Sequence, residues 1–259
     1  MLSSFESHEA KVALVTGAGR GLGRALVLEL VARGMKVGAL GRNAAPLESL
    51  AEEAGDAVLP LVADVSDPES LTAAFARLDG AMGPLDTLIN NAAVYPHRDF
   101  LEETPETFMD TLHINLGGPL AASMLALARM VPRGTGRIVN VGTFAGRRPT
   151  QLAAAYSVSK GAGLILTKAM VADLADRFPD IVITDWIPGA LNTTMGIPEG
   201  HDPAEAARWG AALALWHDQS LNGALFVEQV ESLPEQSLKR QVFNKLTRQS
   251  VTPRRLDRG

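Results

Sequence analysis

The sequence predicts a single α/β domain, a doubly wound parallel sheet with helices on both faces. Short apolar segments of strand character alternate along the chain with longer segments of helical periodicity. A glycine-rich turn also follows the first apolar segment and leads directly into a helix. The length of 259 residues, with 46% hydrophobic and 20% charged residues, suits one domain with a full core.

The elements follow one another in a regular rhythm, without an internal repeat, linker or low-complexity tract. Strands are expected near 11–16, 36–40, 58–62, 87–90, 136–141, 181–187 and 224–227. Helices are expected near 24–32, 46–54, 68–82, 105–131, 154–177 and 203–216. The domain is expected to span 11–230, after an N-terminal arm at 1–10. A basic C-terminal tail at 231–259 loses the periodicity and is expected to fray or to hold a partner.

Composition excludes several classes of site. The absence of cysteine rules out a disulfide scaffold, a thiolate metal site and a cysteine nucleophile, and it fits a reducing cytoplasm. Any redox work must therefore come from a cofactor. The five histidines are scattered without ligand spacing, so no metal site is expected. A net charge of −5 gives no reason to expect nucleic acid, and neither a signal peptide nor a membrane span is indicated.

The glycine-rich turn runs from Gly17 to Gly23 and has the pattern T-G-x-x-x-G-x-G. Glycines let the backbone approach a pyrophosphate closely, and the helix that follows offers free N–H groups and the positive end of its dipole. A glycine-rich turn is often only a turn. The strand before it and the helix after it favour nucleotide binding.

Two arginines bear on which dinucleotide would bind. An acidic residue after the second strand would accept bonds from the ribose hydroxyls of NAD, and none is present there. Arg42 follows that strand instead, and Arg20 lies within the glycine turn, so two guanidinium groups are available for a 2′-phosphate. NADP is therefore favoured over NAD. In the alternative interpretation, Arg42 begins the next helix and stays in solvent.

Tyr156 and Lys160 are four residues apart on a predicted helix, which places both on one face. A free tyrosine titrates near pH 10, so a neighbouring cation is needed to lower its pKa for acid–base work at neutral pH. Lys160 is in position to be that cation, although such a pair is usually a surface pair. Polar or small residues also gather where the strands end, the edge at which such sheets bind ligands. They are Asp64-Val65, Asn90-Asn91-Ala92-Ala93, Gly142-Thr143 and Pro188-Gly189.

Taken together, the motifs from about 11 to 227 resemble the short-chain dehydrogenase/reductase family, whose members have a Rossmann fold. The matching motifs are Thr16 to Gly23, Asp64, Asn90 to Ala93, Tyr156 to Lys160, Pro188-Gly189 and Thr193. By this resemblance the cofactor-binding residues are Gly17, Arg20, Gly21, Leu22, Gly23, Arg42, Asp64, Val65, Asn91, Ala92, Ala93, Tyr156, Lys160, Pro188, Gly189, Leu191 and Thr193.

The resemblance also implies roles in catalysis. Tyr156 would exchange a proton with the substrate oxygen, and Lys160 would lower the pKa of Tyr156 and bond the nicotinamide ribose. Asn115 would hold a water that links Lys160 to solvent, or in the alternative would only kink or cap its helix. Thr143 stands where the family usually has a serine that orients the carbonyl group; its hydroxyl has the same bonding capacity, but its methyl group would crowd the pocket.

The substrate is less well defined by the sequence. The residues expected near the catalytic hydroxyl are Tyr95, His97, Phe144, Arg147, Arg148, Trp186 and Met195, of which the arginines and His97 could equally be solvent-facing loop residues. The family's D-G-G after the last strand is absent, which leaves subunit packing open, but a homodimer or homotetramer is expected. Two functions remain: an NADP-dependent oxidoreductase acting on a carbonyl or alcohol, or a catalytically silent NADP-binding sensor on the same fold.

Overall fold

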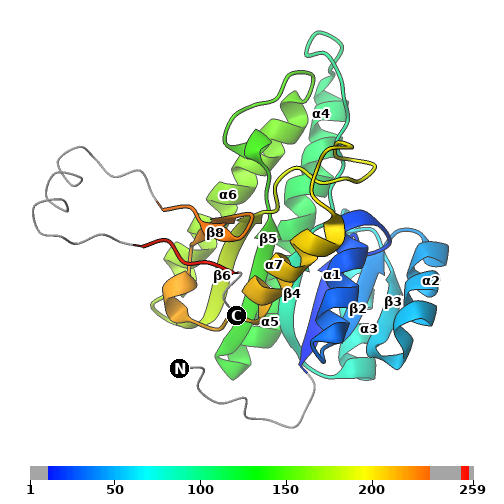
Figure 1. The fold of residues 1–259 in the computed structure, drawn as a ribbon, viewed down its shortest axis with the longest axis vertical. Helices are drawn as coiled ribbons and strands as arrows, with labels where there is room; N and C mark the ends of the chain where they lie inside the picture. The colour runs from blue at the N-terminus through cyan, green and yellow to red at the C-terminus, as the bar shows by residue number, and fades with distance from the viewer. Residues whose placement is uncertain (1–10, 234–251, 257–259) are drawn as a thin grey trace, which may run out of the picture.

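The computed structural model describes residues 11–233 and 252–256. An eight-stranded sheet runs through its centre in the order β3-β2-β1-β4-β5-β6-β7-β8 (Figure 1). Every neighbouring pair is parallel except β7 and β8. The strands are β1 (Val12–Thr16), β2 (Lys36–Gly41), β3 (Val58–Val62), β4 (Leu85–Asn90), β5 (Thr135–Val141), β6 (Asp180–Ile187), β7 (Leu225–Val227) and β8 (Val230–Glu231).

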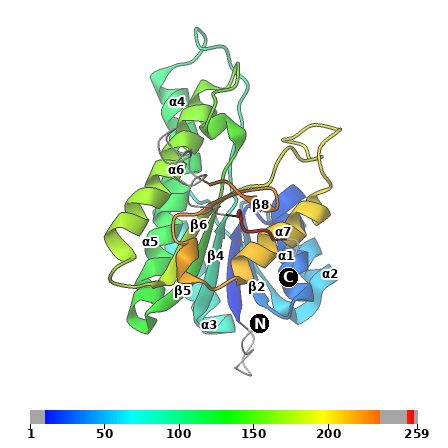
Figure 2. The same ribbon diagram turned by 60° about the vertical axis from the view of Figure 1, so that its left-hand side comes forward.

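Helices cover both faces of this sheet, as the alternating pattern predicted. They are α1 (Gly21–Ala32), α2 (Ala44–Ala54), α3 (Pro68–Met82), α4 (Pro105–Leu112), α5 (Gly118–Met130), α6 (Ala154–Leu174) and α7 (Pro203–Leu215). The buried side chains of α1, α2 and α7 form one core cluster, and those of α3 and α5 form another, against which α6 packs. Figure 2 shows α5 and α6 on one side of the sheet and α1 and α7 on the other. The predicted fold class is confirmed.

The order of the strands reverses at β1, which lies between β2 and β4. Such a reversal opens a crevice at the carboxyl ends of the strands, because the connections on its two sides run to opposite faces of the sheet. The glycine turn after β1 lies at this reversal. The fold therefore places the predicted phosphate-binding turn where doubly wound sheets bind ligands.

The helix predicted at 105–131 differs from the observed structure. It is divided into α4 and α5 by a π-helical segment, His113–Gly117, which contains Asn115. A π-helical turn accommodates one more residue than an α-helical turn and is frequent at functional sites. Nothing in the apolar periodicity marks this insertion, so the sequence predicts one continuous helix.

The composite helical run Pro105–Arg133 is also long and apolar enough to cross a membrane by length and composition alone. Its apolar residues Ala122, Ala126 and Met130 are fully buried in the core cluster that contains the side chains of α3. Packing against the sheet therefore accounts for part of its apolar character.

Part of the predicted C-terminal tail packs on the domain. β8 pairs with β7, and Arg255 forms an antiparallel bridge with Val230. Arg254 donates to Glu231 at 2.8 Å, and Leu256 is only 5% exposed. Within the described residues 252–256, the chain therefore adds to this edge of its own sheet. The remaining residues of the predicted tail, and the predicted arm at 1–10, lie outside the described residues.

Candidate active site

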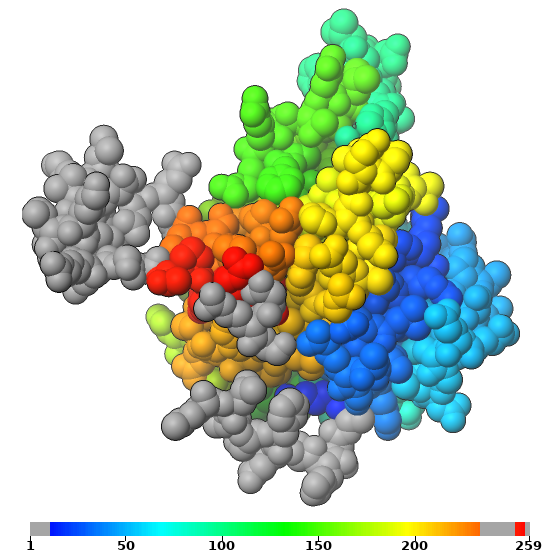
Figure 3. Space-filling model, in the orientation of Figure 1, coloured from blue at the N-terminus to red at the C-terminus, as the bar shows by residue number. Residues whose placement is uncertain are grey.

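The residues predicted to bind a ligand meet at the carboxyl edge of the sheet. Figure 3 shows the segment after β6, in yellow, packed between the blue region that contains the glycine turn and the green loops after β5. The closeness of Gly21 to Thr193 supports this view, since a Cβ atom added at Gly21 would lie 3.3 Å from Cγ2 of Thr193. The glycine turn and the segment after β6 thus form neighbouring walls of one site.

The glycine turn has a backbone that side chains would block. Gly17 and Gly21 have φ angles of 68° and 53°, in the left-handed region that favours glycine. At Gly23, a Cβ would lie 2.1 Å from the carbonyl oxygen of Gly17. This position therefore tolerates only glycine, and the turn can bring its backbone close to a ligand.

The first turn of α1 carries N–H groups suited to a phosphate. Arg20 occupies the N-cap position, and no side chain accepts a hydrogen bond there. The first N–H groups of a helix have no partner within the helix, and the dipole favours an anion at this end. Leu22, predicted to contact the cofactor, is buried in the core, so only its backbone is suited to that contact. The turn and the helix end fit the pyrophosphate of a dinucleotide.

The turn is fixed to the neighbouring strand by Thr16 and Asn91. The hydroxyl of Thr16 accepts bonds from the backbone N–H groups of Asn91 and Ala92, both at 3.0 Å. The amide of Asn91 donates to the carbonyl oxygen of Thr16 at 2.9 Å. Thr16 and Asn91 therefore tie the carboxyl ends of β1 and β4 together, and Ala92 and Ala93 continue along the same edge.

Arg20 and Arg42 are both exposed, Arg20 in the turn after β1 and Arg42 after β2. Asp64, after β3, accepts bonds from the backbone N–H and the hydroxyl of Ser66 at 2.9 and 2.6 Å. Burial alone would raise the pKa of Asp64, but these bonds and the charge of Arg42 bring it below its usual value. Val65 is buried, and its side chain lies against Gly118 at the start of α5.

The P-G turn closes the other end of the site. Gly189, after Pro188, has a φ angle of 87°, and an added Cβ would lie 2.9 Å from Oε1 of Glu228. Leu191 is buried in the core and pairs with His201 in an isolated parallel bridge. The segment from Leu191 to His201 is thereby fixed at both ends.

Tyr156 lies near the start of α6, with its ring against that of Tyr95 at a centroid distance of 4.4 Å. Burial raises the pKa of Tyr156, a side-chain hydrogen bond with Thr143 lowers it, and Tyr95 raises it; the net shift is upward. At neutral pH the phenol therefore keeps its proton and is suited to act as an acid. The contact with Thr143 agrees with the expected place of this hydroxyl beside the phenol.

Lys160 is buried, and its ammonium group donates to the carbonyl oxygen of Val141 at 2.9 Å. Burial lowers the pKa of Lys160 to about 8, while the carboxyl group of Asp185 raises it. The sequence predicted that Lys160 would lower the pKa of Tyr156. In the structure, burial dominates the pKa shift of the phenol and Lys160 is not among its causes, so the effect of Lys160 on Tyr156 stays a prediction.

Asn115 is held by three hydrogen bonds from its side chain. Its oxygen accepts from the N–H of Val94 at 2.8 Å, and its nitrogen donates to the carbonyl oxygen of Val94 at 2.9 Å and to Ser159 at 3.2 Å. The side chain thus joins the loop after β4 to α6. It lies in the π-helical segment, so the helix distortion and the position at the site go together.

Of the predicted substrate-wall residues, Tyr95 contacts the phenol and Trp186 lies away from it. The ring of His97 lies tilted against that of Tyr95 with centroids 4.4 Å apart, and Phe144 is 48% exposed after β5. Trp186, in contrast, is fully buried, and its indole nitrogen donates to the carbonyl oxygen of Glu228 at 3.0 Å. Side chains alternate along β6, which turns Trp186 into the core cluster of α1 and α7.

The remaining predicted wall residues are exposed. Arg147 makes a long hydrogen bond of 3.4 Å to Ser232, close to β8. Arg148 and Met195 are exposed in the loops after β5 and β6. Their solvent-facing positions agree with the loop interpretation of the arginines.

Sequence reasoning missed two residues that shape the site. Gly146 and Gly161 lie back to back, since a Cβ at Gly161 would be 3.0 Å from the carbonyl oxygen of Gly146. This contact lets the 3-10 turn Phe144–Gly146 press directly on α6, and so places Thr143 beside Tyr156. A pair of glycines in two elements that meet only in the fold leaves no local sequence signal.

Comparison with known proteins identifies the family of this chain. Residues 11–204 match the model of the family described as short chain dehydrogenase. The chain belongs to this family. It is 36% identical over 201 residues to a galactitol 2-dehydrogenase (L-tagatose-forming) of Cereibacter sphaeroides, with 76% of this chain and 78% of that protein covered.

Two mammalian relatives have a similar percentage of residues identical to this chain. Human L-xylulose reductase is 37% identical over 194 residues, covering 74% of this chain and 77% of the relative. Pig carbonyl reductase [NADPH] 2 is 38% identical over 197 residues, covering 76% of this chain and 78% of the relative. The protein is thus an oxidoreductase of this family, acting on a small molecule with an alcohol or a carbonyl group.

Proposed function

We propose that the protein reduces a ketone or aldehyde to an alcohol with NADPH. The observation that carries this proposal is the partly buried phenol of Tyr156, which is hydrogen-bonded with Thr143 and has a raised pKa. A phenol that keeps its proton at neutral pH is suited to donate it to a carbonyl oxygen, which is the direction of reduction. A bound nicotinamide dinucleotide would supply the hydride.

The chain's own residues have distinct tasks in this proposal. Thr143 orients the carbonyl group through its hydroxyl, and Tyr156 donates the proton to the carbonyl oxygen. Lys160 provides a buried ammonium group for the ribose hydroxyls. Asn115 holds the loop after β4 against α6, so that the site keeps its shape.

The preference for NADPH rests on charge. Arg20 and Arg42 are exposed and available for the adenosine end of the cofactor, and the charge of Arg42 acts on Asp64. A guanidinium group binds a 2′-phosphate through two parallel hydrogen bonds, which NADH cannot form. The NADPH in the name of the pig relative supports the same choice.

The relatives suggest the first substrates to test. Their names give galactitol, D-erythrulose and L-xylulose, all small polyhydroxylated compounds. We propose a small ketose or a related ketone as the substrate class, bound beside Tyr95, His97 and Phe144. The cytoplasmic location stays a prediction from the composition.

The test is a titration of the intrinsic fluorescence of the three tryptophans with NADPH and with NADH, followed by NADPH oxidation against a panel of ketoses and simple ketones. We expect tighter binding of NADPH and turnover of at least one ketose. Preference for NADH would show that the argument from Arg20 and Arg42 is wrong. Binding of NADPH without turnover of any panel member would favour the silent sensor.

A further inference from the structure

A row of polar side chains crosses the sheet beneath the active site. Asn90 of β4 is the register partner of Asn140 of β5, which is the partner of Asp185 of β6. All three belong to the face covered by α5 and α6, since Asn90 donates to Ser123 of α5 and Asn140 to Thr167 of α6. A sheet face that is otherwise apolar thus carries a polar row whose last member is a carboxyl group.

The hydrogen bonds along this row all point the same way. Asn90 donates to Asn140 at 2.8 Å, Asn140 donates to Thr167 at 2.8 Å, and Thr167 donates to Oδ1 of Asp185 at 2.7 Å. Each donor is oriented toward the carboxyl group, which accepts at the end. A series of donors of this orientation stabilises a carboxylate more than a carboxylic acid.

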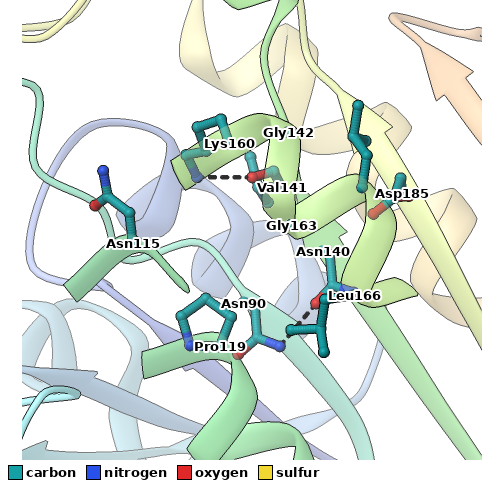
Figure 4. A pocket seen from close by; sticks show the side chains of 11 residues that line it. Asn90, Asn115, Pro119, Asn140, Val141, Gly142, Lys160, Gly163, Leu166 and Asp185 are labelled. Carbon is teal, nitrogen blue, oxygen red and sulfur yellow. Dashed lines mark hydrogen bonds between the residues drawn. The ribbon is translucent and has the colours of Figure 1, made fainter. Parts of the chain in front are cut away.

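Lys160 and the same row both line a small, partly open cavity of about 20 Å³. Its lining includes Asn90, Asn115, Lys160 and Asp185, as Figure 4 shows. Lys160 and Thr167 are two helical turns apart and therefore on the same face of α6. A cavity of this size has room for one water molecule.

Two features of this space bear on whether a water molecule could bridge its polar groups. Gly163 lines the cavity, and an added Cβ there would meet nothing within 4 Å, so no side chain fills the gap below Lys160. Oδ1 of Asn90 is buried and has no hydrogen-bond partner within residues 11–233 and 252–256. An acceptor of this kind suits a bridging water or a polar partner in the cavity.

The charges around the cavity are few. Lys160 is 8% exposed and Asp185 is 4% exposed. Burial raises the pKa of Asp185 to about 7, although the bond from Thr167 and the charges of Lys168 and Lys160 lower it, so the carboxyl group is ionised in the pH range in which Lys160 titrates. Its register partners on β5 and β7 are the uncharged Asn140 and Leu225. Asp185 is in turn the charged group that acts on Lys160.

We propose that Asp185 is a positioning residue for the active site, whose carboxylate acts across the cavity as the counter-ion of Lys160 and keeps that buried ammonium group charged. A buried ammonium group without a counter-ion gives up its proton, because burial disfavours the charged form. The catalytic role of the pairing between Asp185 and Lys160 rests on the proposed function, whereas the pairing itself does not depend on it.

The direct test is a pH titration of Lys160 by NMR, with lysine labelled with ¹³C at Cε and the signal assigned by its loss in Lys160→Met. Burial lowers the pKa of Lys160 to about 8 and Asp185 raises it, so removal of the carboxylate has a definite sign. In Asp185→Asn the midpoint is expected to fall by about one pH unit or more. A midpoint that stays in place or rises would overturn the proposal.

Two further variants test whether a change in the Lys160 midpoint comes from loss of the carboxylate or from altered folding. Asp180→Asn makes the same change at the exposed start of β6 and is expected to leave the midpoint unchanged. Thr167→Val removes the bond donated to Asp185, which raises the pKa of that carboxyl group and is expected to shift the Lys160 midpoint downward by less than Asp185→Asn. If Asp185→Asn does not fold, the Thr167→Val titration decides, and no shift in it would contradict the inference.

The pH profile of turnover separates this inference from the proposed function. With a ketone substrate, the alkaline limb of kcat/KM is expected to move to lower pH in Asp185→Asn by the same amount as the NMR midpoint. A limb that does not move would overturn the role of Asp185 in catalysis. If the unmodified chain has no turnover, the proposed function fails while the NMR titration still tests the pairing.

Discussion

At the scale of single residues, the site is shaped more by burial than by ion pairing. Burial raises the pKa of Tyr156 and lowers that of Lys160, so each group is pushed toward its neutral form. For Tyr156 this is the form needed to donate a proton. For Lys160 it is the wrong form, and the carboxyl group of Asp185 opposes the loss of charge.

Arg42 is the residue on which the proposed preference for NADPH depends. A hydrogen bond to a charged group contributes about 1.5–3 kcal/mol, so Arg42→Ala is expected to raise the Kd of NADPH about 10- to 100-fold. The Kd of NADH should change little, because NADH has no 2′-phosphate. Fluorescence titration of both cofactors measures the difference.

Arg77→Ala is the matched control, because Arg77 is an exposed arginine on α3, outside the predicted cofactor site. Equal weakening of NADPH and NADH in Arg42→Ala would contradict the assignment of Arg42 to the phosphate.

At the scale of elements, the site depends on how closely the turn after β5 approaches α6. An added Cβ at Gly146 would lie 2.8 Å from the carbonyl carbon of Lys160. Backbone atoms of a helix cannot move aside as a flexible side chain can. The two glycines therefore set the distance between Thr143 on the turn and Tyr156 on the helix.

Gly146→Ala is expected to separate these two elements. Overpacking of this kind typically costs about 1–3 kcal/mol, and misplacement of Thr143 should lower kcat about tenfold or more. Thermal unfolding and NADPH oxidation measure the two effects.

The matched control is Gly80→Ala within α3, where an added Cβ meets nothing within 4 Å. This change should leave activity intact and stabilise the helix by up to about 1 kcal/mol. Full activity in Gly146→Ala would show that the close approach is not needed.

Most elements could be predicted because apolar runs and their spacing are local properties. β3 and α3 have the predicted bounds, 58–62 and 68–82, and the other ends differ by only a few residues. The π-helical segment and β8 were missed, because a one-residue insertion and a two-residue strand leave no periodic signal. The part of the site carried by motifs was likewise predictable. The positions of Trp186, Gly146 and Asp185 depend on which elements pack together, and the sequence alone does not show that packing.

At the scale of the whole molecule, one side of the sheet leaves apolar side chains uncovered. Leu120 and Met124 of α5 are 41% and 64% exposed, and Val158 and Ile165 of α6 are 51% and 62% exposed. Both helices lie on the same side of the sheet (Figure 2). Exposed apolar side chains gathered in this way indicate a surface for another subunit. We propose a homodimer or homotetramer built through this surface.

Ile165→Glu is expected to shift the protein toward the monomer, because a carboxylate would have to be buried in the interface. Light scattering after size-exclusion chromatography measures the mass. Val62→Glu is the control. Val62 lies on β3, at the edge of the sheet opposite to β8, and is 52% exposed, so this change should leave the mass unchanged. A monomeric mass for the unmodified chain at micromolar concentration would refute the proposed oligomer.

The central claim is that Tyr156 donates the proton during carbonyl reduction. The chain has two tyrosines, and Tyr95→Phe provides the matched control in the ring that touches Tyr156. The measurement is NADPH oxidation with a ketose that the unmodified chain turns over, together with the Kd of NADPH for each variant. The account predicts that Tyr156→Phe keeps its affinity for NADPH and loses about 10²- to 10⁴-fold in kcat, while Tyr95→Phe retains most of its turnover. Turnover by Tyr156→Phe close to that of the unmodified chain would contradict the account.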